Sequence, residues 1–208
     1  MKRWWTKSAG RALARPALAR GLSSWAGGSV QGDWPRGYEA QVRDGFVGNA
    51  VAQRAVRMVA EGVGAAPLSV SDDAVAKLIG ARSAGQPLLE TVALHLLLHG
   101  NAFVQILRQP DALASELFAL RPERVTIEAD ARGWPAAFAY RTGPTQGGDA
   151  LVRLAVEDVI HVKTLHPLDD HYGLGCLGAA AGPIAIHNAA TRWNKALLDN
   201  AAPRQPSP

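Results

Sequence analysis

Cysteine is nearly absent from this chain, because Cys176 is the single thiol among 208 residues. One thiol excludes a disulfide framework and a cysteine-rich structural zinc site. Long apolar runs are also lacking: His95 interrupts the densest one, 94–98, and no run approaches the ~18 residues that a membrane-spanning helix needs. With 48% hydrophobic and 19% charged residues, most of the chain is expected to be globular rather than disordered.

Acidic residues are missing before Asp33, which sets the N-terminal stretch apart from the rest. Residues 1–43 carry eight Lys or Arg against two acids, whereas residues 44–208 carry 14 basic and 16 acidic residues. Four of the six tryptophans also lie before position 35. The basic character therefore belongs to an N-terminal arm, and the remainder of the chain is mildly acidic.

We predict that residues 1–45 form a flexible basic arm that orders against a partner subunit, since Gly27, Gly28 and Ser29 disfavour an isolated helix. A secretory signal is disfavoured because arginines interrupt the apolar core that it requires. Two alternatives remain open: an organelle transit peptide, and a small module that binds nucleic acid or a membrane surface.

The apolar residues after Asn49 recur at helical spacing and predict a helix that stops before Pro67. Its apolar positions are Val51, Ala55, Val59 and Val63, flanked by Met58. Shorter helices are predicted over 73–79 and from Pro87 to about Leu98, with Gly100 as the residue after the helix end. Strands are predicted over 103–107, 117–120, 125–128, 138–141 and 159–163, with a loop at 143–149. This mixture indicates an α+β domain over residues 46–172.

A long amphipathic helix is predicted over residues 173–200, followed by a disordered, proline-containing tail at 201–208. Pro183 either starts this helix or kinks a longer one that begins near Cys176. Helical spacing places two sets of side chains on two different sides. The apolar set is Ile186, Ala190, Trp193 and Leu197, and the polar set is Asn188, Arg192, Lys195 and Asp199.

The motifs that could carry chemistry each have a simpler structural interpretation. Residues 173–178 (GLGCLG) match the dinucleotide-binding pattern, but the preceding strand ends too far upstream and no second parallel strand follows. The cluster His166, Asp169, Asp170 and His171 could bind a metal or transfer protons, although such turns more often cap a helix. His95 and His99 lack the glutamate of a zinc-protease motif, and Cys176 has no adjacent cation. We therefore predict no enzyme, no cofactor and no metal.

Several stretches, taken in order, carry a family resemblance. They are 49–61 (NAVAQRAVRMVAE), 97–108 (LLHGNAFVQILR), 120–125 (LRPERV), 158–163 (DVIHVK), 166–174 (HPLDDHYGL) and 187–200 (HNAATRWNKALLDN). Over about residues 46–200 the chain resembles phage portal proteins, the head–tail connectors of long-tailed phages. The last stretch is closest to the branch found in gene transfer agents.

The resemblance implies a structural role at one capsid vertex. Portal subunits form a ring, usually of twelve copies, through which double-stranded DNA passes without sequence recognition. The ring docks the terminase large subunit, and it also contacts capsid and head–tail connector proteins. The implied location is the portal vertex of the virion, with assembly in the bacterial cytoplasm. By the same resemblance, residues 46–172 are the wing-like domain and 173–200 are the first stem helix.

The resemblance also suggests roles for the two sides of that helix. Asn188, Arg192 and Lys195 become candidates for the channel or intersubunit face. Ile186, Trp193 and Leu197 become candidates for packing against other elements or a neighbouring subunit.

The sequence departs from the family pattern in two respects. Gly175 and Cys176 stand where family members have Ser-Pro, and the pair Gly182–Pro183 is unusual in that helix. No counterpart of the second stem helix is visible, so we expect a truncated portal protein that does not close a stable ring by itself. A degenerate prophage-derived fragment without portal activity is the alternative.

Overall fold

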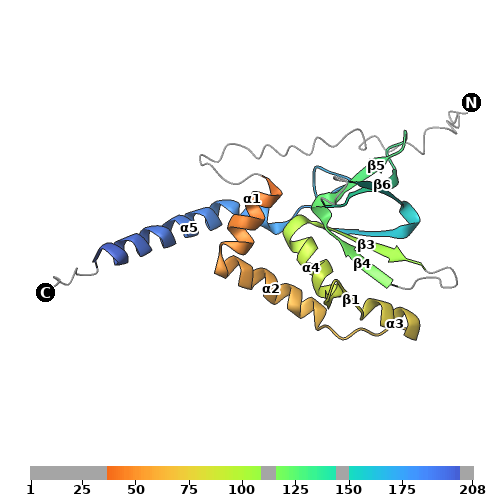
Figure 1. Cartoon of the computed structure of the whole chain (residues 1–208), viewed down its shortest axis with the longest axis horizontal. Helices are drawn as coiled ribbons and strands as arrows, with labels where there is room; N and C mark the ends of the chain where they lie inside the picture. Colours follow the sequence, from red (N-terminus) through yellow and green to blue (C-terminus); the bar gives the residue numbers. More distant parts are fainter. Residues whose placement is uncertain (1–36, 109–115, 144–149, 202–208) are drawn as a thin grey trace, which may run out of the picture.

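Two antiparallel three-stranded sheets stack on one another, helices cover the outer face of one of them, and one long helix leaves this body (Figure 1). The computed structural model describes residues 37–108, 116–143 and 150–201. In this part of the chain the helical segments are α1 (Tyr38–Val42), the π-helical turn η2 (Arg43–Val47), α2 (Ala50–Gly64), α3 (Asp73–Ile79), α4 (Leu88–His99) and α5 (Cys176–Ala201), with short 3-10 turns at η3 (Pro122–Arg124) and η4 (Val156–Asp158).

The strands pair antiparallel throughout the described sheets. Their bounds are β1 (Arg82–Ser83), β2 (Gln86–Pro87), β3 (Asn101–Leu107), β4 (Glu116–Leu120), β5 (Val125–Ala129), β6 (Pro135–Arg141), β7 (Leu151–Ala155) and β8 (Val159–Lys163). One sheet has the order β4-β3-β8 and the other β5-β6-β7, while β1 and β2 form a small hairpin. Strand β3 is therefore central, and it is buried on both faces over its first four residues.

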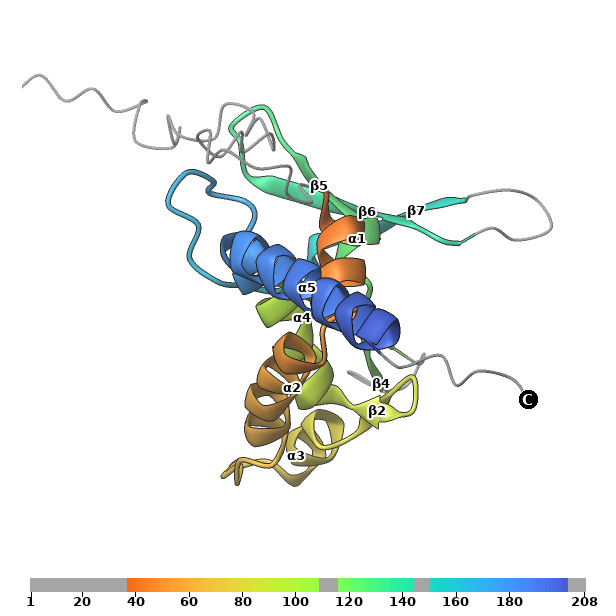
Figure 2. The same cartoon turned by 90° about the vertical axis from the view of Figure 1, so that its left-hand side faces the viewer.

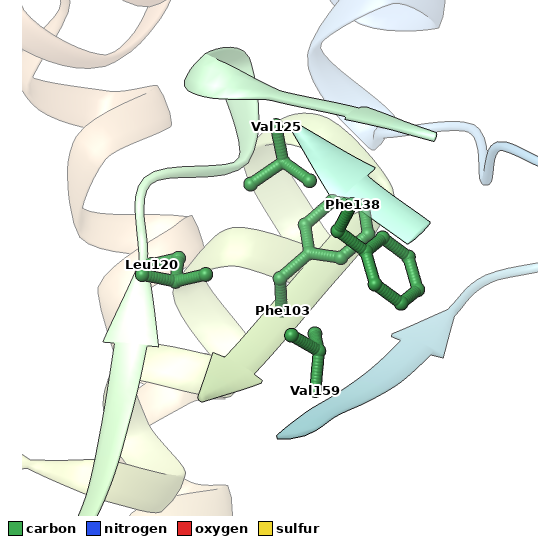
Figure 3. Close-up of a cluster of buried hydrophobic side chains, with 5 residues drawn as sticks. All are labelled: Phe103, Leu120, Val125, Phe138 and Val159. Atoms are coloured by element: carbon green, nitrogen blue, oxygen red, sulfur yellow. The ribbon is translucent and has the colours of Figure 1, made fainter. Parts of the chain in front are cut away.

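The main core lies between the two three-stranded sheets (Figure 3). Its buried side chains are Phe103, Leu120, Val125, Phe138 and Val159. The rings of Phe103 and Phe138 meet edge to face with centroids 5.6 Å apart, an arrangement that adds to the burial of apolar area. On the opposite face of β3, Val104 packs with Leu88 of α4, because successive strand residues point to opposite sides.

The predicted elements are largely confirmed. Helices α2, α3 and α4 and strands β3, β4, β5, β6 and β8 lie within a few residues of the predicted ranges. The long helix begins at Cys176 and contains Pro183 in its interior, which selects the second of the two interpretations of that proline. Strand β7 and the β1–β2 hairpin were not predicted. Helix α1 and η2 fall inside the stretch assigned to a flexible arm, and residues 1–36 and the tail 202–208 lie outside the described residues.

A close backbone crossing fixes where α5 leaves the body. Gly100 ends α4 in the left-handed conformation, at φ 84°, and its carbonyl accepts a hydrogen bond from the Thr164 amide at 2.9 Å. A Cβ placed on Gly173 would lie 1.9 Å from that same carbonyl oxygen, and one on Gly175 would lie 2.4 Å from the Leu98 carbonyl oxygen. Both glycines are therefore required by the approach of two backbones.

The side chain of Asn101 is buried and holds these two backbone segments together by hydrogen bonds. Its Oδ1 accepts from the Gly173 amide at 2.8 Å and pairs with the Nε2 of His161 at 3.1 Å. Its Nδ2 donates to the Gly173 carbonyl and contacts the Nδ1 of His99. One side chain thus joins the end of α4, the edge strand β8 and the segment that leads into α5. We call Gly100, Asn101, Gly173 and Gly175 the crossing.

Replacing Gly173 by alanine is expected to lower the free energy of unfolding by about 3 kcal/mol, because the new methyl group overlaps the Gly100 carbonyl. Gly62→Ala is the matched control, since a Cβ at Gly62 in α2 has no neighbour within 4 Å. The control should raise the free energy of unfolding by about 0.5–1 kcal/mol. Urea denaturation of both variants measures the difference in the free energy of unfolding. Equal values for the two variants would contradict the close approach of the Gly100 and Gly173 backbones.

Candidate functional site

Helix α5 is held to the body along its first half and extends beyond it along its second half (Figure 1). Leu177 is buried, and Ala181, Ile184 and Ala185 are half-buried on the side that faces α1 and η2. From Ala189 to Asn200 every side chain is exposed. The view along the projecting end shows α5 lying across α4 and beside α1 (Figure 2). The second half of the helix is therefore available for contacts with other molecules.

An asparagine pair fastens α5 at the point where it leaves the body. Asn49 is buried and caps α2, because its Oδ1 accepts from the Ala52 amide at 2.9 Å. Its Nδ2 donates to Oδ1 of Asn188 at 2.8 Å and lies 3.0 Å from Nδ1 of His187. The Nδ2 of Asn188 then donates to the Asp44 carbonyl at 2.9 Å. These bonds connect η2, the start of α2 and the middle of α5.

A groove of about 560 Å³ lies between α1–η2 and α5. Its walls combine small residues with a few polar ones. The lining residues are Ala40, Gln41, Asp44, Gly45, Gly48, Leu177, Ala181, Ile184, Ala185, Asn188, Thr191 and Arg192. Gly45 is buried here, and a Cβ at this position would already touch Ile184 and Leu177 at 3.4 Å. The walls of the groove are therefore mostly uncharged, with Asp44 and Arg192 as its charged residues.

The apolar set predicted on α5 is exposed in this chain. Ile186 is 62% exposed, Trp193 64% and Leu197 47%. We call Ile186, Ala190, Trp193 and Leu197 the α5 stripe. A tryptophan with this exposure on a projecting helix is typical of a surface that another molecule covers.

The polar set predicted on α5 divides into two parts. Asn188 is half-buried and uses its amide within the chain, so the structure places it in the asparagine pair rather than on a free face. Arg192 lines the groove, and Lys195 forms an ion pair with Asp199 at 2.5 Å. Arg192 and Lys195 are exposed and remain candidates for a channel or intersubunit face.

A second exposed apolar face lies on α2. The residues identified as its apolar side are largely at the surface, with Val51 65%, Met58 59% and Val59 51% exposed. Val56 and Ala60 are the buried residues of this helix. Periodicity reveals an apolar face but not what covers it, so only the structure separates core from surface.

The glycines of residues 173–178 serve packing rather than a phosphate. Gly173 and Gly175 belong to the crossing, and a Cβ on Gly178 would meet only the Gln41 side chain. Cys176 donates through its thiol to the Leu97 carbonyl at 3.0 Å, and burial raises the pKa of this thiol. A raised pKa keeps the sulfur protonated and therefore a poor nucleophile.

The acidic and histidine residues before α5 form a local turn. The Oδ1 of Asp169 accepts from the amides of His171 at 2.7 Å and Tyr172 at 2.9 Å. The Nδ1 of His166 accepts from the Leu168 amide at 3.1 Å. This carboxylate and this imidazole are thus engaged in shaping the turn. Within residues 37–108, 116–143 and 150–201, no group of three or more His, Cys, Asp or Glu is arranged to hold a metal ion.

Three half-buried histidines lie on α4 and β8, and sequence reasoning did not predict their grouping. His161 stacks on Phe103 with centroids 4.3 Å apart, and His99 meets the Tyr38 ring edge to face. The Nδ1 of His95 is buried without a hydrogen-bond partner among the described residues. Burial lowers the pKa of each of these histidines, His95, His99 and His161, to about 4. All three are therefore neutral near pH 7.

In the described residues, no helix has the length and apolar character needed to cross a membrane.

Comparison with known proteins gives one consistent family. The model for the family described as phage portal protein matches residues 50–205. An uncharacterized protein of Rickettsia felis (strain ATCC VR-1525 / URRWXCal2) is 30% identical over 173 residues, which cover 74% of this chain and 43% of that protein. An uncharacterized protein of Rickettsia bellii (strain RML369-C) is 29% identical over 175 residues, which cover 76% and 44%.

Solved structures of gene transfer agent (GTA) particles share the fold. A chain in the virion of the native GTA particle has a TM-score of 0.71 and 35% identity, with coverage of 85% of this chain and 49% of that chain. A chain in the neck of the native GTA particle, computed with C12 symmetry, has a TM-score of 0.71 and 36% identity, with coverage of 82% and 47%. The chain thus spans about half the length of the proteins that it matches.

The half-buried histidines make stability depend on pH. The unfolded chain takes up these protons near the ordinary pKa of 6.5, whereas the folded chain takes them up only near 4. Between these values the unfolded state holds more protons, so the free energy of unfolding falls as pH falls from 6.5 toward 4. Urea denaturation at pH steps measures the slope. His95→Leu should reduce it by up to one proton, and an unchanged slope would contradict this assignment.

Proposed function

The chain belongs to the phage portal protein family, and from this premise we propose that it acts as a structural subunit of a portal ring at the capsid vertex of a phage or gene transfer agent particle. Membership rests on the family match over residues 50–205 and on the shared fold. The observation that carries the assembly role is the exposed α5 stripe on a helix that projects from the body. Exposed apolar surface of this kind marks a site of interaction with another molecule.

The ring proposal draws support from the solved relatives. The necks of GTA particles that contain similar chains were computed with C12 and C6 symmetry. Cyclic symmetry requires each subunit to present two different surfaces, one to each neighbour. We infer that copies of this chain associate head to tail, with the α5 stripe as one of the two surfaces, and that the ring is part of the virion.

The partners that follow from this role are double-stranded DNA, the terminase large subunit, and capsid and head–tail connector proteins. Arg192 and Lys195 are the α5 residues that we assign to the channel face. Phosphate contacts from a few lysines and arginines are independent of sequence and weaken as salt rises, which suits a duplex that moves. Asn188, which the sequence grouped with them, instead holds α5 to the body.

The role that we propose is structural and not enzymatic. Asp169 and His166 accept hydrogen bonds from backbone amides, and the pKa of the Cys176 thiol is raised. These residues are therefore poorly suited to catalysis. A catalytic alternative makes a different prediction, namely stoichiometric binding of zinc, manganese or magnesium that is lost in Asp169→Ala. Isothermal titration calorimetry with these three ions distinguishes the two roles.

Self-association should depend on Trp193 and not on Lys195. Trp193→Ala removes the largest side chain of the α5 stripe and is expected to weaken association at least tenfold, because a buried tryptophan is often a dominant contact at an interface. Lys195→Ala is the matched control two residues away on the opposite side of α5, and it should associate as the unmodified chain does. Sedimentation velocity over a range of concentrations measures both. A monomeric unmodified chain, or loss of association in the lysine variant alone, would contradict the proposal.

A further inference from the structure

The two faces of α5 point in opposite directions. Residues Leu177, Ala181, Ile184, Ala185 and Asn188 face the body and form one wall of the groove. The α5 stripe consists of Ile186, Ala190, Trp193 and Leu197. At 3.6 residues per turn these two sets are centred about 180° apart around the helix axis. A subunit therefore carries a groove on one side of α5 and an apolar ridge on the other.

The charges of α5 are confined to the side of the groove. The charged residues of this helix are Arg192, Lys195 and Asp199, and all three follow the direction of Asn188 around the axis. The opposite arc of the helix carries no charge over its whole length. Burial of the α5 stripe against another surface therefore requires no charged group of this helix to leave water.

The groove has the shape and chemistry to receive such a ridge. Its volume is about 560 Å³, and Ala40, Gly45, Ala181 and Ala185 contribute small side chains to walls that also include Leu177 and Ile184. Large side chains on one surface and small ones on the other allow close packing, as in a protein interior. Trp193 is the bulkiest exposed side chain of the stripe. Its apolar ring suits the apolar residues that line the groove.

We propose that the α5 stripe of one subunit packs into the groove between α1–η2 and α5 of the next subunit, with Trp193 as the anchor. This inference rests on the proposed portal ring and assigns the two surfaces that meet in it. A ridge and a groove on opposite sides of one helix give a head-to-tail contact that repeats from subunit to subunit. A contact of one stripe with another stripe would instead produce closed dimers.

Chemical cross-linking of the whole chain tests this pairing. Cys176→Ser first removes the native thiol, and serine can still donate to the Leu97 carbonyl. In this background Ala40→Cys places a thiol in the groove and Ala190→Cys places one on the stripe. A short bis-maleimide is then added at a concentration where the chain self-associates. The matched control replaces the stripe position by Lys195→Cys, which keeps the groove thiol.

The expected result is a ladder of covalent dimers, trimers and larger species from the Ala40→Cys/Ala190→Cys protein. Neither single variant nor the Lys195→Cys control should form the ladder. Dimers from Ala190→Cys alone would show stripe-to-stripe packing and overturn the inference. Self-association without any ladder would show that the stripe and the groove do not meet, and would overturn the inference while the portal ring stands. A chain that stays monomeric at every concentration would overturn both.

Discussion

The contact of two backbones at the crossing is the constraint on which the position of α5 depends. Gly100 ends α4 and Gly173 passes so close to it that neither residue has room for a side chain. Asn101 then uses both ends of its amide to hold the segment that leads into α5. Because close-packed backbone yields little, this contact fixes where α5 begins, and the contacts of its first half with α1, η2 and α4 then fix its direction. The long helix can therefore project and still be well oriented.

A projecting helix with a fixed direction has consequences for assembly. The asparagine pair of Asn49 and Asn188 holds its middle, and beyond this point its side chains face solvent. Exposed apolar surface on α5 and α2 is costly for an isolated chain and useful for one that is surrounded by copies of itself. Membership of the phage portal family gives this pattern a simple explanation, since a ring subunit meets neighbours on two sides.

Local signals in the sequence were sufficient for most elements of the fold. Strand-like runs predicted β3 and β5, and Gly100 marked the end of α4. Strand β7 was not predicted, because its five residues are mostly exposed and show no alternating burial. The glycines of the crossing could not be interpreted from spacing, because their reason is a contact between segments about 70 residues apart. The apolar positions of α2 were found from their spacing, but what covers them was not, because apolar periodicity is the same for a core and for an interface.

Hydrogen–deuterium exchange at low and high protein concentration tests the central claim, that the second half of α5 is an assembly surface. Local opening of a helix is suppressed when its apolar side becomes buried, so exchange reports coverage directly. We expect the amides of residues 177–185 to be protected from exchange at both concentrations. The amides of residues 186–198 should gain protection only as the concentration rises. Equal exchange of residues 186–198 at every concentration would contradict it.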